Sequence, residues 1–263
     1  MALYGVVADI HGNREALEVA LAALERRGIR RILCLGDIVG YNADPDECAE
    51  MLRSRGALAI AGNHDLIGTG RLGFERCSNQ AMYALKRTRR TLGRAAADWL
   101  ATLPPHRVIG DDVVLVHGGV RDVQQYVKHP SLVAQNAEWL RADFPRARLC
   151  LFGHSHEQKV YEIEGAQVRE LPRSDSNLLN RNLLYFINPG SVDAQRKQSD
   201  KAAECAILDT LDWSVEFLRL RYDSAATEAK AAVFGYRIGR WTDRFYTFRR
   251  RILRRRPSTA AAR

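Results

Sequence analysis

Two carboxylates, one amide and four imidazoles recur in five short motifs along this chain of 263 residues. The motifs are Asp-x-His, Gly-Asp, Gly-Asn-His-Asp, His-Gly-Gly and Gly-His-Ser-His, and their candidate metal ligands are Asp9, His11, Asp37, Asn63, His117, His154 and His156. Carboxylate and imidazole suit divalent ions such as manganese, iron, nickel and zinc. Seven ligands exceed what one ion needs, so the set predicts two divalent metal ions that share a bridging carboxylate.

Two such ions would support hydrolytic chemistry. Ions about 3.5–4 Å apart can hold the attacking and the leaving oxygen of an in-line phosphoryl displacement. They also lower the pKa of a bridging water toward neutrality, so hydroxide becomes available as the nucleophile. We therefore expect a dinuclear phosphoesterase that hydrolyses phosphodiester bonds, or phosphomonoester bonds, by direct attack of that hydroxide.

The segments before these motifs must position them, and in the first third of the chain strand and helix patterns alternate. Apolar runs predict strands, and apolar residues at helical spacing predict helices between them. The expected strands are 3–8, 31–35 and 57–61, and the expected helices are 13–28 and 45–55. This alternation predicts a largely parallel sheet, and Asp9, Asp37 and Asn63 would meet at its carboxyl edge.

The second half of the chain is denser in strand patterns. Helical patterns cover 74–103 and 131–143, and strand patterns cover 107–110, 113–117, 148–152, 159–163, 166–170, 183–187, 203–209 and 214–220. His117 and His154 again lie at or just after strand ends. The whole pattern predicts an α/β fold, a four-layer α/β/β/α sandwich of two mixed β-sheets flanked by helices.

Composition favours a cytoplasmic protein, with peripheral membrane attachment as the alternative. Hydrophobic residues make up 46% and charged residues 27% of the chain, as in ordinary globular proteins. No apolar run reaches the roughly 18 residues of a membrane span. The N-terminal apolar stretch lacks a signal peptide's basic region and cleavage site, so we expect it to be the first strand. The five cysteines form no Cys-x-x-Cys pair, which argues against a cysteine zinc site.

The net charge of +9 comes from the C-terminal end. Residues 237–263 hold ten arginines and one acid, so the rest of the chain, with 30 basic and 30 acidic residues, is neutral. We therefore expect a catalytic domain over 1–222 and a basic helical extension over 223–263, with a disordered end from 257. Within the extension, one helical face carries Trp241, Phe245, Phe248 and Ile252.

This amphipathic pattern has two interpretations. The helix could bind an anionic membrane surface or nucleic acid. Alternatively, it could dock its aromatic face on the body of the protein, or on another subunit in a homo-oligomer, with the arginines in solvent. We favour the second interpretation.

Together, the motifs resemble those of the calcineurin-like metallophosphoesterase superfamily, over residues 3 to about 220. The stretches DIHGN (9–13), GDIVGYN (36–42), GNHD (62–65) and NPGSV (188–192) are most similar to its small bacterial phosphodiesterase-type branch. The resemblance implies one metal held by Asp9, His11, Asp37 and His156, and a second held by Asp37, Asn63, His117 and His154. It implies that His64 is catalytic, because it would stabilise the transition state or protonate the leaving oxygen. We expect manganese, with iron, nickel and zinc as alternatives.

The chain departs at two positions from the Ser/Thr protein phosphatases, a neighbouring branch of the superfamily, and this departure narrows the class of substrate that we expect. Gly40 and Tyr41 stand where Ser/Thr protein phosphatases have an aspartate and a phosphate-binding arginine. Without that arginine a phosphate dianion loses a bidentate partner. The sequence therefore favours a small phosphodiester or nucleotide substrate, and it leaves the group that orients His64 unidentified.

Several alternatives stay open at this point. They are a Ser/Thr-phosphatase-like activity, dinucleoside polyphosphate hydrolysis, and a non-catalytic scaffold with the same fold, against which the complete ligand set argues. We expect the substrate pocket to be walled by 66–79 and 120–145, with Arg121 and Lys128 as candidate contacts.

Overall fold

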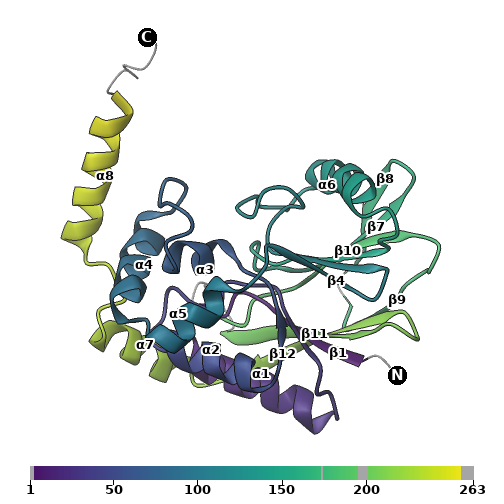
Figure 1. The fold of residues 1–263 in the computed structure, drawn as a ribbon, viewed down its shortest axis with the longest axis horizontal. Helices are drawn as coiled ribbons and strands as arrows, with labels where there is room; N and C mark the ends of the chain where they lie inside the picture. The colour runs from purple at the N-terminus through teal and green to yellow at the C-terminus, as the bar shows by residue number, and fades with distance from the viewer. Residues whose placement is uncertain (1–2, 173, 195–200, 256–263) are drawn as a thin grey trace.

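Two six-stranded mixed sheets lie face to face between outer helices, in a computed structural model that describes residues 3–172, 174–194 and 201–255 (Figure 1). The first sheet contains, in spatial order, β3 (Leu58–Ala59), β2 (Ile32–Cys34), β1 (Leu3–Val7), β11 (Ala202–Asp209), β12 (Ser214–Arg221) and β9 (Ser176–Leu178). The second contains β4 (His106–Ile109), β5 (Val113–Val116), β6 (Leu149–Leu151), β10 (Leu184–Pro189), β7 (Gln158–Glu164) and β8 (Gln167–Glu170). This arrangement confirms the predicted four-layer sandwich.

Helices cover both outer faces. Those on the side of the first sheet are α1 (Arg14–Arg26), α2 (Pro45–Ser54), α5 (Arg94–Ala101) and α7 (Ser224–Val233), and α6 (Pro130–Asp143) covers the second sheet. The Asn13 side chain caps α1 by accepting a hydrogen bond from the Ala16 amide, and Leu17, Leu21 and Leu24 are buried at helical spacing. Near the opening between the sheets lie α3 (Asn63–Gly68) and α4 (Asn79–Thr91), and α8 (Arg240–Arg255) projects from the body.

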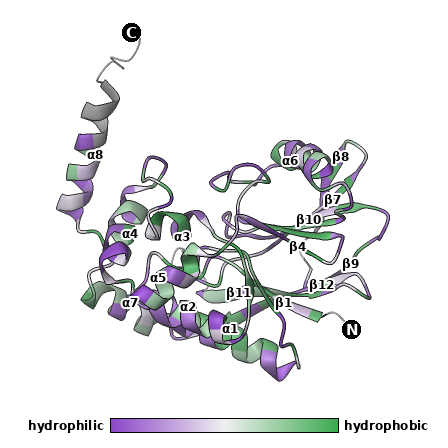
Figure 2. Cartoon of the chain, viewed as in Figure 1, coloured by the Kyte–Doolittle hydropathy of each residue, from purple (hydrophilic) through white to green (hydrophobic). Residues whose placement is uncertain are grey.

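Alternation along the strands builds separate apolar layers. In β1, Val6 faces the second sheet, whereas Val7 packs toward the helices of the first. In β5, Leu115 lies between the sheets, whereas Val114 packs beneath α6. Figure 2 shows hydrophobic stretches on strands of both sheets and on parts of the helices that cover them. Each central strand is thus buried on both faces, which explains its continuous apolar sequence.

The strands that lead to the candidate ligands run parallel within each sheet. In the first sheet, β1 pairs with β2 and β2 with β3, all in parallel. In the second, β6 is parallel to both β5 and β10. Loops that leave these carboxyl ends therefore gather along one edge, as predicted.

The secondary structure differs from the prediction in a few places. The helical pattern over 74–103 is two helices, because Leu92 takes an extended conformation that ends α4, and Gly93 caps α5. The short elements α3 and β9 were not predicted. The helical extension expected over 223–263 contains two helices, α7 and α8. All five cysteines are buried.

The prediction that α8 docks its aromatic face on the body is wrong, whereas the alternative contact with another subunit stays a prediction. Trp241, Phe245 and Phe248 are exposed, and the contacts of α8 to α4 come from its other side, through Asp243 and Thr247. No helix in the described part of the chain is long and apolar enough to cross a membrane. The end expected to be disordered, 257–263, lies outside the described residues.

Candidate metal centre

All seven candidate ligands come together at the carboxyl edge of the two sheets. Asp9 follows β1, Asp37 follows β2, Asn63 begins α3 after β3, and His117 and His154 follow β5 and β6. Among the described residues, six non-glycine residues have a positive φ, and five of them are Asp9, His11, Asp37, His154 and His156. Such conformations are uncommon and cost energy, so their concentration here indicates a loop geometry that serves the side chains.

The ligand atoms form neighbouring groups that could each hold a metal ion. Within each group the ligand atoms lie within 4.8 Å of one another, and the groups are Asp9 with His11 and His156, His11 with Asp37 and His64, and Asp37 with His117 and His154. Asp37 belongs to two of these groups, with its Oδ2 3.9 Å from His11 Nε2 and 3.3 Å from His117 Nε2. Asp37 therefore lies where a bridging carboxylate would be needed.

Asn63 completes the group around His117. Its Oδ1 lies 3.1 Å from His117 Nε2. On the other side of Asp37, His156 Nε2 lies 3.3 Å from both His11 Nε2 and Asp9 Oδ1. The amide oxygen, the carboxylates and the imidazole nitrogens thus point into one shared space, which is the arrangement that two adjacent cations require.

Backbone carbonyls fix the orientation of two imidazoles. Leu35 O accepts a hydrogen bond of 2.7 Å from His117 Nδ1, so Nε2 is directed at Asp37. Val39 O accepts a longer one, 3.4 Å, from His11 Nδ1. A ring whose Nδ1 donates to a carbonyl presents Nε2 as its ligand atom, which is a common arrangement of metal-binding histidines.

Both buried carboxylates are held in their charged form. Burial alone would raise the pKa of Asp9, but the charge and hydrogen bond of His156 outweigh burial and lower the pKa. Burial would also raise the pKa of Asp37, but the charges of His117 and His64 outweigh burial and hold this pKa well below its ordinary value. The carboxylates are therefore ready to bind cations.

The surroundings shift the pKa values of the His117 and His154 imidazoles in opposite directions. Burial disfavours a charged His117, but the charge and hydrogen bond of Asp37 raise its pKa to about 9. Burial and the neighbouring charge of His117 lower the pKa of His154 to about 3. His154 Nε2 is also a buried atom with no hydrogen-bond partner in the described part of the chain. A neutral, buried nitrogen of this kind fits a metal ligand, because cation coordination would satisfy it.

Ring contacts and a glycine position His64, whose orienting group the sequence had not identified. Its ring centroid lies 4.5 Å from that of His11 and 4.8 Å from that of Tyr41. A Cβ at Gly40 would lie 2.3 Å from His64 Nδ1, and Gly40 has a φ of +136°. A side chain at position 40 would collide with His64 where it stands, so Gly40 leaves room for this imidazole, which packs against the rings of His11 and Tyr41.

Asp65, which the sequence analysis gave no role, joins α3 to the loop after β2. Its carboxylate accepts hydrogen bonds from the amides of Ile38, Val39 and Gly62. Burial and the charge of Asp37 raise the pKa of Asp65 to about 7, and the amide donors oppose that rise. A Cβ at Gly62 would lie 2.2 Å from Asp37 Oδ1, so the two loops touch only because Gly62 has no side chain.

The Asn-Pro-Gly-Ser stretch ties the ligand loops of the two sheets together. Asn188 Nδ2 donates to Gly153 O at 2.8 Å and to Ser155 Oγ at 2.9 Å. Ser191 Oγ donates to Asp9 O at 3.0 Å. Asn188 and Ser191 are fully buried, so this motif is a scaffold for the histidine and aspartate loops.

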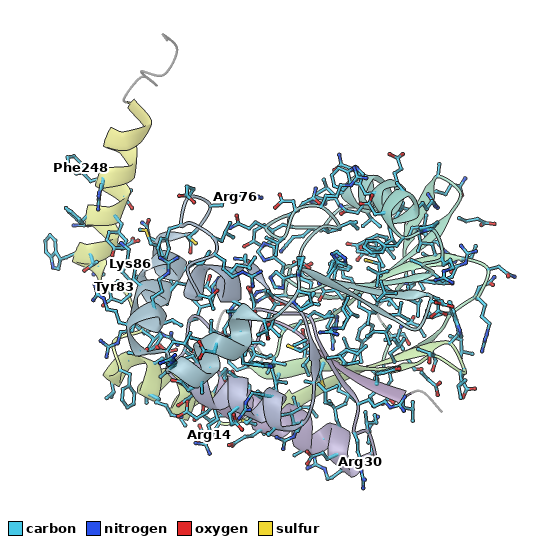
Figure 3. The ribbon with its side chains drawn as sticks, in the orientation of Figure 1. Arg14, Arg30, Arg76, Tyr83, Lys86 and Phe248 are labelled. Carbon is cyan, nitrogen blue, oxygen red and sulfur yellow. The ribbon has the colours of Figure 1, made fainter. Side chains whose placement is uncertain are left out.

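A cavity of about 290 Å³ opens next to His64, Asn63 and His154. Its walls come from the two predicted segments, through Arg76, Cys77 and Ser78 on one side and Gln124 and Tyr126 on the other, together with Tyr41 and Ala81. Figure 3 shows Arg76 above α4, on the side that faces the second sheet. The sequence patterns carried no signal for Arg76 or Tyr126.

The expected substrate contacts Arg121 and Lys128 do not line this cavity. Arg121 forms an exposed bidentate pair with Asp143, and Lys128 pairs with Glu157. Arg76 and Tyr126 are among the side chains that line it instead, and the Tyr126 ring centroid lies 4.0 Å from that of His154.

Comparison with known proteins gives consistent matches. The sequence pattern of the calcineurin-like phosphoesterase superfamily domain matches residues 2–212. An uncharacterised protein of Methanocaldococcus jannaschii is 33% identical over 229 residues, which are 84% of this chain and 88% of that protein. A metallophosphoesterase from Sphaerobacter thermophilus superposes with a TM-score of 0.74 at 29% identity, over 92% of this chain and 96% of the other. A hypothetical protein from Pyrococcus horikoshii OT3 shares the fold, with a TM-score of 0.68 at 18% identity over 93% and 97%.

Proposed function

The chain belongs to the calcineurin-like phosphoesterase superfamily, and from this premise we propose that it is a dinuclear metal-dependent phosphodiesterase. The observation that carries the proposal is the pair of buried ligand groups that flank Asp37 at the mouth of a cavity. Such a site suits hydrolysis of a phosphate ester, because the cations and the substrate phosphate would meet at one point.

The seven ligands divide around Asp37 into two sets. Asp9, His11 and His156, together with Asp37, would hold one ion, and the distances among their ligand atoms support this set. Asn63, His117 and His154, together with Asp37, would hold the other, and the buried Nε2 of His154 supports this set. Manganese is the proposed metal, with iron, nickel and zinc as alternatives that imidazole and carboxylate also suit.

The reaction divides between the cations and His64. When bound, two cations neutralise phosphoryl charge and supply hydroxide by lowering the pKa of water. His64 lines the cavity and belongs to the ligand-distance group of His11 and Asp37, so its ring can reach the same phosphate. We assign it the stabilisation of the transition state and protonation of the leaving oxygen.

The charge of the cavity favours a diester over a monoester. Arg76 is the only cationic side chain, apart from histidines, among the lining residues that the structure describes. Both Asp122 carboxylate oxygens accept from Arg76 Nη1 at 2.8 Å, and Gln124 O accepts from its Nη2. A guanidinium already paired in this way is a weak partner for a phosphate dianion, whereas a diester carries one charge less.

Aromatic side chains support an ester with a flat organic group. Tyr126 is about half exposed, at 49%, and together with Tyr41 it lines the cavity beside the ligand groups. Tyrosine rings of this kind stack on planar groups. We therefore place nucleotides and aryl phosphodiesters first among the substrates, with dinucleoside polyphosphates as the next class to test.

Turnover of synthetic esters by the manganese-loaded protein tests the proposal. We expect hydrolysis of bis-(para-nitrophenyl) phosphate to exceed that of para-nitrophenyl phosphate. Asp37→Asn should lower kcat/KM by more than about 10²-fold, which exceeds the usual loss for groups that only support a ligand. The matched control is Asp98→Asn, on an exposed helix face, which should keep full activity.

Two outcomes would overturn the proposal. A folded Asp37→Asn protein with full activity would remove the metal assignment. A wild-type protein that binds two metal ions but turns over none of these esters, nor a dinucleoside polyphosphate, would favour the scaffold alternative.

A further inference from the structure

The C-terminal helix α8 is joined to the body along one side only. Asn79 on α4 donates from Nδ2 to the Asp243 carboxylate at 2.9 Å and to Thr247 Oγ1 at 3.0 Å. Lys86, also on α4, lies over the Tyr246 ring at 4.9 Å. From this attachment the helix extends beyond the rest of the molecule (Figure 1). Among the residues of α8 whose side chains the structure describes, these contacts to α4 lie on one side of the helix.

The side turned away from α4 is aromatic. Trp241, Phe245 and Phe248 are 81%, 58% and 61% exposed. At about 100° per residue they fall within a sector of about 60° that lies opposite Asp243 and Thr247. Figure 3 shows Phe248 pointing away from the body. Three large exposed rings on one stripe mark an interaction surface, because soluble surfaces rarely expose such patches without a partner.

Positive charge surrounds the aromatic stripe. Residues 237–263 carry ten arginines and one acid, whereas the rest of the chain has no net charge. Arg244 lies with its guanidinium carbon 5.6 Å from the centroid of the Trp241 ring, and Arg249 is exposed on the other side of the stripe. The surface therefore pairs an apolar centre with cationic margins.

We propose that α8 binds the surface of an anionic lipid membrane, with its aromatic stripe at the acyl boundary and its arginines among the headgroups. Lipid interfaces take up helices with this distribution, and each arginine near an anionic leaflet strengthens attachment. The inference concerns α8 alone and does not rest on the proposed reaction.

The distribution of charge and aromatic rings favours an anionic membrane over a second copy of the chain or a nucleic acid as the partner. A second copy of the chain would bring two segments of net charge +9 together, and their repulsion opposes pairing. A nucleic-acid duplex would satisfy the arginines, but its stacked bases would leave the tryptophan and phenylalanine rings in water. A single strand could stack its bases on these rings, so it is compared directly with the membrane below. An anionic bilayer satisfies both parts of the surface.

The attachment also lies close to the cavity along the chain. Ser78 and Ala81 line the cavity, and Asn79, between them, binds α8. The start of α4 therefore contributes both to the cavity wall and to the anchor of the helix. A membrane-bound α8 would hold the cavity near the bilayer.

Sedimentation with vesicles of equal parts phosphatidylglycerol and phosphatidylcholine tests the proposal on the full chain. We expect wild-type protein to bind these vesicles and not pure phosphatidylcholine, with a blue shift of Trp241 fluorescence. The triple variant Trp241→Ala, Phe245→Ala, Phe248→Ala should bind at least about tenfold more weakly, since burying these rings drives insertion. The control Leu178→Ala with Leu211→Ala, which alters exposed apolar residues elsewhere, should bind as wild type.

Each other result would overturn the proposal. Equal vesicle binding by the triple variant would remove the aromatic stripe from the interaction. Absence of wild-type binding to the anionic vesicles would exclude the membrane. A single-stranded oligonucleotide that binds more tightly than the vesicles, or self-association in sedimentation velocity that the triple variant abolishes, would identify nucleic acid or a second copy instead. The far-UV circular dichroism and the unfolding midpoint of the triple variant should match those of the wild type, which shows that its body is intact.

Discussion

The metal centre and helix α8 both concentrate charge, but they do so in opposite environments. At the centre, two aspartates and three of the four candidate histidine ligands have a backbone in an uncommon, positive-φ conformation, and buried hydrogen bonds hold the loops that carry Asp9 and His154. On α8, arginines and aromatic rings face solvent, and a few contacts to α4 fix the helix. Figure 2 shows the contrast, with hydrophilic and apolar residues mixed along the exposed helix.

The metal centre and α8 illustrate two different ways in which a sequence can encode function. The function of the metal centre depends on where each ligand atom lies, because a small displacement of one side chain would disrupt the ligand group to which it belongs. Helix α8 depends on composition and face, because a lipid surface recognises charge and apolar area without fixed geometry. The following changes should therefore affect one region and leave the other unaltered.

His64→Gln should produce the largest effect. Loss of a general acid costs about 10²–10⁴-fold, and the loss should be greatest for diesters with poor leaving groups, which need the proton most. We expect a smaller loss with para-nitrophenol as the leaving group, and unchanged vesicle binding by α8. Steady-state kinetics across a leaving-group series would check this, and an equal loss for every leaving group would contradict the acid role.

Metal affinity should rise with pH at the centre, because His117 must lose a proton to bind. Its pKa of about 9 in the metal-free protein lies above the ordinary 6.5. The protonated ring therefore stabilises the metal-free fold fully below about pH 6.5, and this contribution disappears as the pH rises through about 9. The Kd for manganese should fall about tenfold per pH unit over this window. Titration calorimetry would measure it.

The same pH series sharpens the contrast with α8. Arginine does not titrate in this range, so vesicle binding should stay constant while manganese affinity changes. A manganese Kd that is flat with pH would contradict a proton-carrying His117.

Tyr126→Ala should have the smallest effect. Stacking of an aromatic side chain contributes about 0.5–1.5 kcal/mol, so KM for an aryl diester should rise about two- to tenfold. Dimethyl phosphate, which has no ring, should show no change in its inhibition constant. Equal weakening of both ligands would mean that Tyr126 acts through its contact with His154 and not through the substrate.

The sequence predicted the fold, and it predicted which side chains gather at the carboxyl edge of the sheets, because both depend on local patterns. Apolar runs followed by Asp37 or His117 place ligands at strand ends, and parallel strands then bring those ends together. The break at Leu92 and Gly93 was not predicted, because the surrounding residues keep a helical composition on both sides. Strand β9 was missed because its three residues are too few to show a period.

Contacts between distant segments could not be predicted. Arg76 and Tyr126 carry no motif, and only the fold brings them to one cavity. The packing of the His64 ring against His11 and Tyr41 likewise depends on contacts between distant segments. The direction of the aromatic stripe on α8 was wrong because helical periodicity defines a face but not what that face meets. Asn79 binds Asp243 and Thr247 on the opposite side of α8, and these contacts turn the aromatic stripe away from the body.

The number of manganese ions bound per chain tests the central claim most directly. Equilibrium dialysis of wild-type protein should give two ions per chain at saturation, and Asp98→Asn should also bind two. Asp37→Asn should bind at most one ion tightly, because Asp37 lies between both ligand groups. A wild-type protein that saturates with one ion or none, or an Asp37→Asn protein that keeps two ions with unchanged affinity, would contradict a dinuclear site bridged at Asp37.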